Sequence, residues 1–149
     1  QIEAEVYDAF AQSQFQYKQV DLYSALSFGK TTYQRIGLYE NGFFPGERSF
    51  GPGEKLDFTT FAFKSGLTYR LSGRHVFSLN AAYFQNAPTI QNSYSNARQN
   101  ANAVDGLTEV KAQSADLSYN YKSPVLSGRV TGFYAGFQDE TNVGFYYTE

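Results

Sequence analysis

The sequence predicts an all-β fold of antiparallel up-and-down strands that forms part of a large transmembrane β-barrel. Segments of roughly 12–15 residues alternate between apolar and polar side chains, whereas an ordinary strand has about 5–6 residues. Very short connections between these segments take turns with long polar ones. Short turns at one end and long loops at the other are typical of the wall of a membrane barrel.

Five segments carry this alternation and are predicted to be strands. In the second of them, Phe61 and Phe63 share one face, whereas Lys64 and Gly66 lie on the other. This split follows because successive side chains of a strand point to opposite sides. The segments, in chain order, are Leu22–Gln34, Asp57–Leu71, His75–Asn86, Glu109–Tyr121 and Ser127–Gln138.

Other parts of the pattern are less regular. Glu3–Tyr17 alternates imperfectly and is expected to add a sixth strand. The phase of the fourth predicted strand shifts by one residue near Gln113 and Ser114, which indicates a β-bulge. In the last strand either phase fits, because aromatic side chains occupy both faces, as the neighbours Phe133 and Tyr134 illustrate.

The connections set the direction of the sheet. Short ones are expected at Lys18–Asp21, Ser72–Arg74 and Lys122–Leu126, and long ones at Arg35–Leu56 and Ala87–Thr108. Several cations lie near the short turns, where they are either solvated turn residues or an electrostatic contact for a ligand or a lipid headgroup. These cations are Lys18, Arg70, Arg74, Lys122 and Arg129.

The number of strands bears on the size of the domain. Six strands, or seven if Asn142–Tyr147 adds another, fall short of the 8 that close the smallest membrane barrels. An open edge in lipid leaves backbone polar groups unpaired, at several kcal/mol for each group. We therefore expect residues 1–149 to be a partial β-barrel domain of a longer chain. In such a wall, Lys64 and Asp116 would face a polar lumen.

Composition and motifs exclude several classes of function. The chain has a net charge of −2 and no cysteine, so neither a nucleic-acid partner nor a thiolate metal site is expected. Its single histidine, His75, lies beside a turn. The adjacent acids Asp139 and Glu140 would point to opposite faces of a strand, which does not suit acid–base catalysis. We expect no enzymatic activity, no cofactor and no metal site.

The two long loops are the expected place for recognition. The first contains Asn-Gly and Pro-Gly pairs that favour turns. The second holds six Asn or Gln side chains. Loops longer than about 12–15 residues are usually functional or mobile. The second loop is thus either a solvated connection or an amide-rich surface that hydrogen-bonds a ligand such as a glycan.

Several local motifs resemble those of one protein family. Phe44-Pro45 is followed by Ser49-Phe50-Gly51, and later come Gly66-Leu67-Thr68-Tyr69, the run from Ala87-Pro88 to Arg98-x-Asn100, and Leu126–Tyr134. In this order and spacing they resemble TonB-dependent outer-membrane receptors of the branch with a carboxypeptidase-regulatory-like N-terminal domain. The chain departs from that pattern at Asn96-Ala97, where the resemblance leads us to expect a serine-proline pair.

The resemblance implies active uptake of a nutrient, such as a glycan or a siderophore, across the bacterial outer membrane. It also implies a plug domain that lies outside these residues. The expected partners are outer-membrane lipid, a small-molecule or oligosaccharide ligand and the TonB energising complex, which acts through the plug region; involvement of a surface lipoprotein is left open. Ligand contacts are expected from Phe43, Phe44, Arg48, Asn86, Gln91, Asn92, Tyr94, Arg98 and Asn100.

A second interpretation places the chain in another class. It would be a self-contained small β-barrel used for adhesion, or a soluble β-sandwich that acts as a binding module. Independence from detergent and cooperative unfolding in water would favour this interpretation over a receptor fragment.

Overall fold

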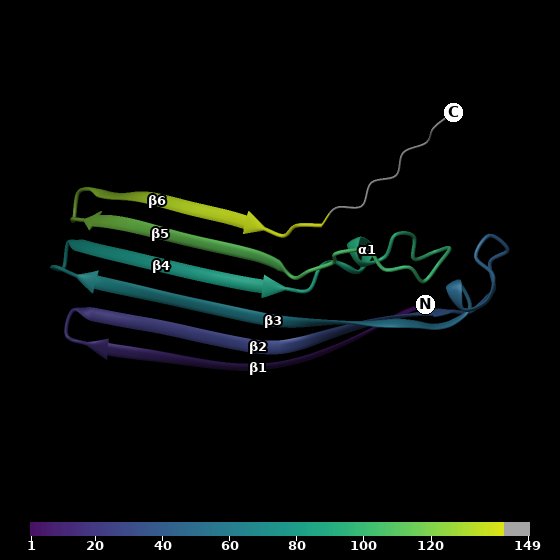
Figure 1. The fold of residues 1–149 in the computed structure, drawn as a ribbon. Helices are drawn as coiled ribbons and strands as arrows, with labels where there is room; N and C mark the ends of the chain where they lie inside the picture. The colour runs from purple at the N-terminus through teal and green to yellow at the C-terminus, as the bar shows by residue number, and fades with distance from the viewer. Residues whose placement is uncertain (142–149) are drawn as a thin grey trace, which may run out of the picture.

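The computed structural model describes residues 1–141, which form one antiparallel sheet of six strands (Figure 1). Each strand pairs with its neighbour in the sequence, so the order in the sheet is β1-β2-β3-β4-β5-β6. The predicted all-β, up-and-down arrangement is therefore confirmed. The strands are β1 (Ile2–Tyr17), β2 (Val20–Gly37), β3 (Gly51–Arg70), β4 (His75–Asn86), β5 (Val110–Lys122) and β6 (Ser127–Gln138).

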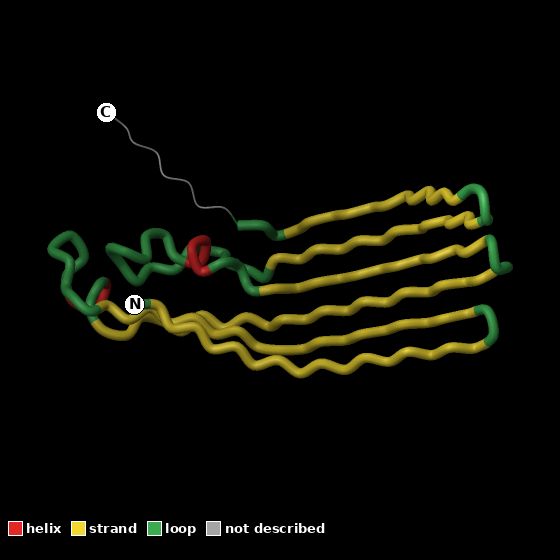
Figure 2. The backbone as a smooth tube through the Cα atoms, turned by 180° about the vertical axis from the view of Figure 1, so that it is seen from behind, coloured by secondary structure: helices red, strands yellow, loops and turns green. Residues whose placement is uncertain are grey.

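The connections are sorted by length between the two ends of the sheet (Figure 2). Residues 18–19, 71–74 and 123–126 make short turns at one end. At the other end, residues 38–50 contain the 3-10 helix η1 (Gly46–Arg48), and residues 87–109 contain the helix α1 (Ile90–Ser93). No helix among the described residues is long and apolar enough to cross a membrane.

The register places most apolar strand residues on one side of the sheet, which we call the apolar face. Leu22 lies opposite Leu67, Leu67 opposite Leu79, and Leu79 opposite Leu117. Directly paired residues point to the same side, so this row crosses four strands on one face. Leu117 is 57% exposed, which shows that nothing in the described part of the chain covers the row.

Aromatic side chains lie in two rows that border this aliphatic strip. Near the short turns, Phe77 and Tyr119 are paired, and their ring centroids are 5.0 Å apart. Toward the long loops, the rings of Phe61 and Tyr83 are 6.1 Å apart. Beyond the second row the same face becomes polar, and Lys30 forms an ion pair with Asp57 at 2.9 Å.

The opposite side, the polar face, is held by side-chain hydrogen bonds between strands. The Asn80 amide donates to Asp116 Oδ1 at 2.9 Å, and Ser27 donates to the Asp8 carboxylate at 2.8 Å. Arg70 forms an ion pair with Asp21 across β2 and β3. Lys64 shares this face with Asp116 by register, and its Nζ lies 5.1 Å from the centre of the Phe84 ring.

The observed strands are longer than predicted at the loop end, so the predicted loop Arg35–Leu56 was too long. The glycines and proline that indicated a turn still pair, because Ile36 lies opposite Pro52 and Gly37 opposite Gly51 after a register shift. The first predicted turn, Lys18–Asp21, is also shorter, since β2 begins at Val20.

The bulge predicted near Gln113 and Ser114 was wrong. Pairing of β5 with both neighbours is continuous through these residues. Gln113 therefore stays on the apolar face, where its Nε2 lies 3.5 Å from the Tyr134 hydroxyl. Because the polar Gln113 side chain finds the Tyr134 hydroxyl on this face, it is accommodated there without a change of register.

The structure also settles the open phase of the last strand. In β6, Val130 and Tyr134 lie opposite Tyr119 and Ala115 and so belong to the apolar face, whereas Phe133 falls on the polar face. The irregular segment at the beginning of the chain forms β1 as predicted. The seventh strand predicted at Asn142–Tyr147 lies outside the described residues.

Gly29 marks a point where only glycine fits between β1 and β3. A Cβ atom there would lie 2.4 Å from the Tyr7 carbonyl oxygen and 2.8 Å from Thr60 Oγ1. We expect Gly29→Ala to destabilise the sheet by about 1–3 kcal/mol, the usual cost of overpacking. Gly132→Ala is the matched control, because no atom lies within 4 Å of its added Cβ. Equal urea midpoints for the two variants, measured by circular dichroism, would contradict the close approach.

Candidate ligand-binding site: the two long loops

The two long loops, residues 38–50 and 87–109, lie together at one end of the sheet (Figure 1), and we call them the loop pair. The backbone N–H of Ala101 donates to the Arg48 carbonyl at 2.9 Å and so joins them directly. Three of the four most deeply buried larger side chains of residues 1–141 belong to this pair, namely Pro88, Ser49 and Ser93. The loop pair is therefore packed, in contrast to the open apolar face.

The 38–50 loop is shaped by its own hydrogen bonds. Phe44 N–H donates to the Asn41 carbonyl at 2.9 Å, and Asn41 Oδ1 accepts from Phe43 N–H at 3.0 Å. Ser49 Oγ donates to the Phe44 carbonyl and accepts from Asn41 N–H. The turn that the Asn-Gly pair predicted is thus closed by the buried Ser49 hydroxyl, and it leaves the Phe43 ring 89% exposed.

The 87–109 loop folds back on itself beyond α1. Tyr94 and Ala103 form an isolated antiparallel bridge, and Val104 N–H donates to the Ser93 carbonyl at 3.1 Å. Asn100 Oδ1 accepts from the backbone N–H of Asn102 at 3.1 Å. A side-chain amide thus replaces a backbone partner inside this loop, which is a frequent role of Asn in turns.

Arg35, at the end of β2, joins both loops to the sheet. Its Nε donates to the Ala97 carbonyl at 2.8 Å, and its Nη1 donates to the Ser49 carbonyl at 2.9 Å. The Arg35 side chain is 6% exposed, and it forms no ion pair among the described residues. Charge-assisted bonds to carbonyl groups therefore carry the whole compensation for this buried cation.

Arg35 also determines which side of the sheet the loops cover. By register it shares the polar face with Tyr33 and Phe58. Phe58 is buried against the Tyr33 ring, at 5.7 Å between centroids. Because Arg35 reaches both loops, the loop pair folds over the polar face and leaves the apolar face open.

Tyr94 is the most deeply placed aromatic side chain of the loop pair, with 2% exposure. Its hydroxyl forms no hydrogen bond of normal geometry within the described residues. Burial raises the pKa of this phenol, and the nearby Arg35 offsets part of the rise. Tyr94 therefore stays neutral at physiological pH, as a group buried beside a cation.

The structure separates the expected ligand contacts into two groups. Tyr94 and Asn100 are buried, and Asn92 donates to the Thr141 carbonyl at 2.7 Å, so these three shape the loops. Phe44 is half-buried below the Asn41 turn. The side chains available to a ligand are those of Phe43, Arg48, Asn86, Gln91 and Arg98, all exposed.

One of these exposed residues borders a hollow on the polar face. Asn86 lines a space of about 350 Å³ together with Asp8, Ser27, Tyr33 and Thr60. Hydroxyl, carboxylate and amide groups in one hollow can exchange several hydrogen bonds with a polar ligand. The hollow lies at the loop end of β1 to β4, beneath the strand segment that carries Arg35.

Arg35 is the residue that the sequence did not single out. Its two acceptors lie 14 and 62 residues away in the chain. No local motif relates them, and the sequence placed Arg35 only at the boundary of a loop. The alternation of β2 gave the one usable signal, since it continues through Arg35 onto the polar face.

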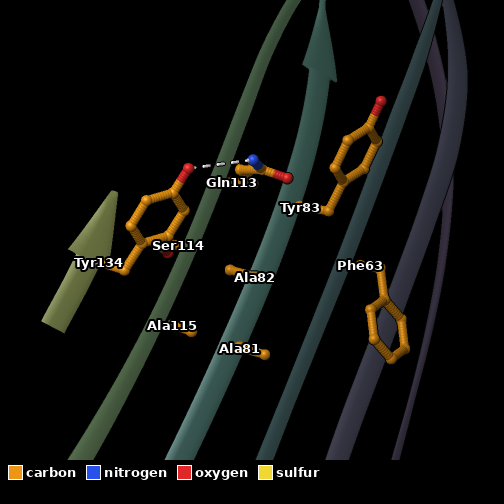
Figure 3. A pocket seen from close by; sticks show the side chains of 8 residues that line it. All are labelled: Phe63, Ala81, Ala82, Tyr83, Gln113, Ser114, Ala115 and Tyr134. Atoms are coloured by element: carbon orange, nitrogen blue, oxygen red, sulfur yellow. Dashed lines mark hydrogen bonds between the residues drawn. The ribbon is translucent and has the colours of Figure 1, made fainter. Parts of the chain in front are cut away.

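A second hollow opens on the apolar face, with a volume of about 270 Å³ (Figure 3). Ala81 and Ala115 form its floor, and the rings of Phe63, Tyr83 and Tyr134 stand around it. Because small side chains lie between large rings, this face has a depression. Its apolar lining is compatible with a hydrocarbon chain. The lining of the hollow contains no Asp, Glu, Lys, Arg or His side chain.

No group of three or more His, Asp or Glu side chains in residues 1–141 is placed to hold a metal ion. His75 is used at the short-turn end, where its Nδ1 lies 2.7 Å from the Tyr119 hydroxyl. Asp139 forms an ion pair with Lys111 at 2.8 Å.

Comparisons of the chain with models of protein families, with curated proteins and with solved structures find no match.

We predict that Arg35→Met loosens the loop pair while the sheet persists. The substitution removes two charge-assisted hydrogen bonds, each worth about 1.5–3 kcal/mol, and frees the Ser49 and Ala97 carbonyls. Trypsin should then cut after Arg48 and Arg98 at least tenfold faster. Lys55→Met is the matched control, because it also removes one tryptic site but no side-chain hydrogen bond among the described residues. Unchanged cleavage rates in Arg35→Met would show that Arg35 does not hold the two loops against the sheet.

Proposed function

We propose that this sheet is part of the barrel wall of a TonB-dependent outer-membrane receptor, which takes up a nutrient actively across the bacterial outer membrane. The observation that carries the proposal is the continuous apolar face, uncovered in the described residues and bordered by aromatic rows. The motifs from Phe44-Pro45 to Leu126–Tyr134 support the family assignment by resemblance.

The dimensions of the apolar face suit a bilayer. Phe61 and Tyr69 belong to the two aromatic rows and are eight residues apart on β3, which corresponds to about 26 Å along the strand. A tilt of about 40° lowers the height between the rows to about 20 Å, within the roughly 25 Å apolar band of membrane barrels. Aromatic residues at both borders are typical of such bands.

The polar face suits a hydrated lumen. It carries Lys64 and Asp116 on neighbouring rows near the middle of the sheet, where a lipid-facing surface would exclude charge. Asn80 and Asp116 satisfy each other across β4 and β5. The polar face is also the side that the loop pair covers, as expected if the loops close over the mouth of a lumen.

Ligand recognition falls to the loop pair in this proposal. The packed loops hold Phe43, Arg48, Gln91 and Arg98 at the surface, and Asn86 opens into the adjoining hollow. A preformed surface loses less conformational entropy on binding than a mobile one. The energising contact and the plug would belong to other parts of the receptor.

Two single tryptophans test whether lipid covers the apolar face. The chain has no tryptophan, so Leu117→Trp on the apolar face and Phe133→Trp on the polar face each give one probe. In vesicles with brominated acyl chains, the proposal expects blue-shifted, strongly quenched emission from Leu117→Trp only. The native side chains at the two sites are 57% and 83% exposed in the described sheet. A tryptophan therefore has room at both positions, and a difference in quenching does not result from steric strain.

A soluble sandwich would give a different result. Its apolar face would be covered by another protein layer, and the chain would remain in solution with no quenching at either position. Equal quenching at both positions would also contradict the proposal, because lipid would then reach the polar face.

The reading frame that encodes the chain offers an independent test of the receptor assignment. The proposal expects a plug domain upstream and enough further alternating strands to close a barrel. A frame that encodes neither, together with lipid contact at Leu117→Trp, would favour the self-contained small barrel.

A further inference from the structure

Cations gather at the short-turn end of the sheet. Within residues 15–22, 68–78 and 118–130 there is one carboxylate, that of Asp21. The same three segments contain five cations, which are Lys18, Arg70, Arg74, Lys122 and Arg129. The chain as a whole has a net charge of −2, so this end departs strongly from the average.

The three short turns form one continuous border. Arg70 N–H donates to the Gln19 carbonyl at 2.8 Å, and Lys122 N–H donates to the Arg74 carbonyl at 2.9 Å. These bonds place each turn beside the next along the sheet (Figure 2). We call this border, residues 18–19, 71–74 and 123–126 with the strand residues next to them, the short-turn rim.

Most of the rim cations have no carboxylate partner. Arg70 is paired with Asp21, whereas no ion pair among residues 1–141 involves Lys18, Arg74 or Lys122. All three side chains are exposed. Arg129 donates only to the hydroxyls of Ser118 and Thr131. The rim therefore presents uncompensated positive charge to its surroundings.

Acidic side chains dominate the other end of the sheet instead. The cations there are partly neutralised, since Lys30 and Lys111 are paired with Asp57 and Asp139. The carboxylates at this end are Glu3, Glu5, Glu40, Glu47, Glu54, Asp57, Asp105, Glu109, Asp139 and Glu140. The rim is thus the end of the sheet at which cations outnumber carboxylates.

Aromatic groups of the apolar face lie directly beside the rim cations. His75 packs between Tyr119 and Tyr121, at 6.0 and 5.2 Å between ring centroids, and Lys18 Nζ lies 5.2 Å from the centre of the Tyr17 ring. A hollow of about 350 Å³ opens between Tyr121, Lys122 and Arg129. Cations next to amphipathic rings at the border of an apolar band match the polar boundary of a bilayer.

We propose that the short-turn rim binds the anionic headgroups of membrane phospholipids, chiefly through Lys18, Arg74 and Lys122. The phosphate is the recognised group. This proposal depends on the proposed function, because it requires the apolar face to lie in lipid. Contacts between the rim and the headgroups would fix how deeply the sheet lies in the bilayer and which of its ends meets the anionic leaflet.

Vesicle binding of the full chain tests the proposal. The chain is diluted from urea onto vesicles of phosphatidylcholine alone, or of phosphatidylcholine mixed with phosphatidylglycerol, and bound protein is separated by flotation. The rim variant is Lys18→Gln/Arg74→Gln/Lys122→Gln. The control is Lys30→Gln/Lys55→Gln/Lys111→Gln, which changes the net charge equally at lysines that lie near carboxylates.

The expected result is tighter binding of the unaltered chain and of the control to the mixture than to phosphatidylcholine. Each rim cation should contribute about fivefold, so the rim variant should lose about a hundredfold of this preference. At about 1 M ionic strength, where the Debye length is about 3 Å, the preference should vanish for all three proteins.

The contradicting results separate the two proposals. Equal binding to both kinds of vesicle, with Leu117→Trp still quenched, would overturn headgroup binding and leave the membrane wall intact. If the rim variant and the control lost equal parts of the preference for anionic vesicles, headgroup binding by the rim would also be overturned. The preference would then depend on net charge and not on the position of the cations. Failure to bind either vesicle would overturn the membrane wall and headgroup binding together.

Discussion

Cross-strand pairing of alternating side chains is the constraint on which the rest of this structure depends. The register that sets Leu67 between Leu22 and Leu79 also gathers the aromatic rows on one face and places Lys64 and Asp116, near the middle of the sheet, on the other. Slippage by one residue would exchange the two faces of a strand. Residues 1–141 leave the apolar face uncovered, and in the proposed function lipid would cover it.

The loop pair obeys a different rule from the sheet. Its stability comes from buried polar groups with defined partners, such as Ser49 and Asn100, and from the buried Arg35 cation. An unpaired polar group in such a cluster costs more than its hydrogen bond returns. The loops are consequently held in one arrangement over the polar face, although they contain little regular secondary structure.

The sequence was sufficient for the sheet because alternation is a local signal. Residues two apart in Asp57–Leu71 already reveal the two faces, and strand order follows from connection lengths. The strand ends near the long loops were harder to predict from the sequence, since Gly51 and Pro52 have turn propensity but are paired with β2. For the candidate site, the sequence named Phe43 and Arg98, which are exposed, together with Tyr94, which is buried. The burial of Tyr94 depends on contacts with distant residues that no local pattern encodes.

Charge and topology together give the sheet a direction. At the short turns cations outnumber carboxylates by five to one, whereas the opposite end carries packed loops and an excess of carboxylates. The strands β1 and β6 form the two edges of the sheet, so within residues 1–141 each pairs with a neighbour on one side only. The two edge strands run antiparallel to each other. A further strand beside either edge can therefore continue the meander with its short turns at the same rim. An extended wall would repeat this polarity, so each added hairpin would place its turn at the short-turn rim and its long connection at the end that carries the loop pair.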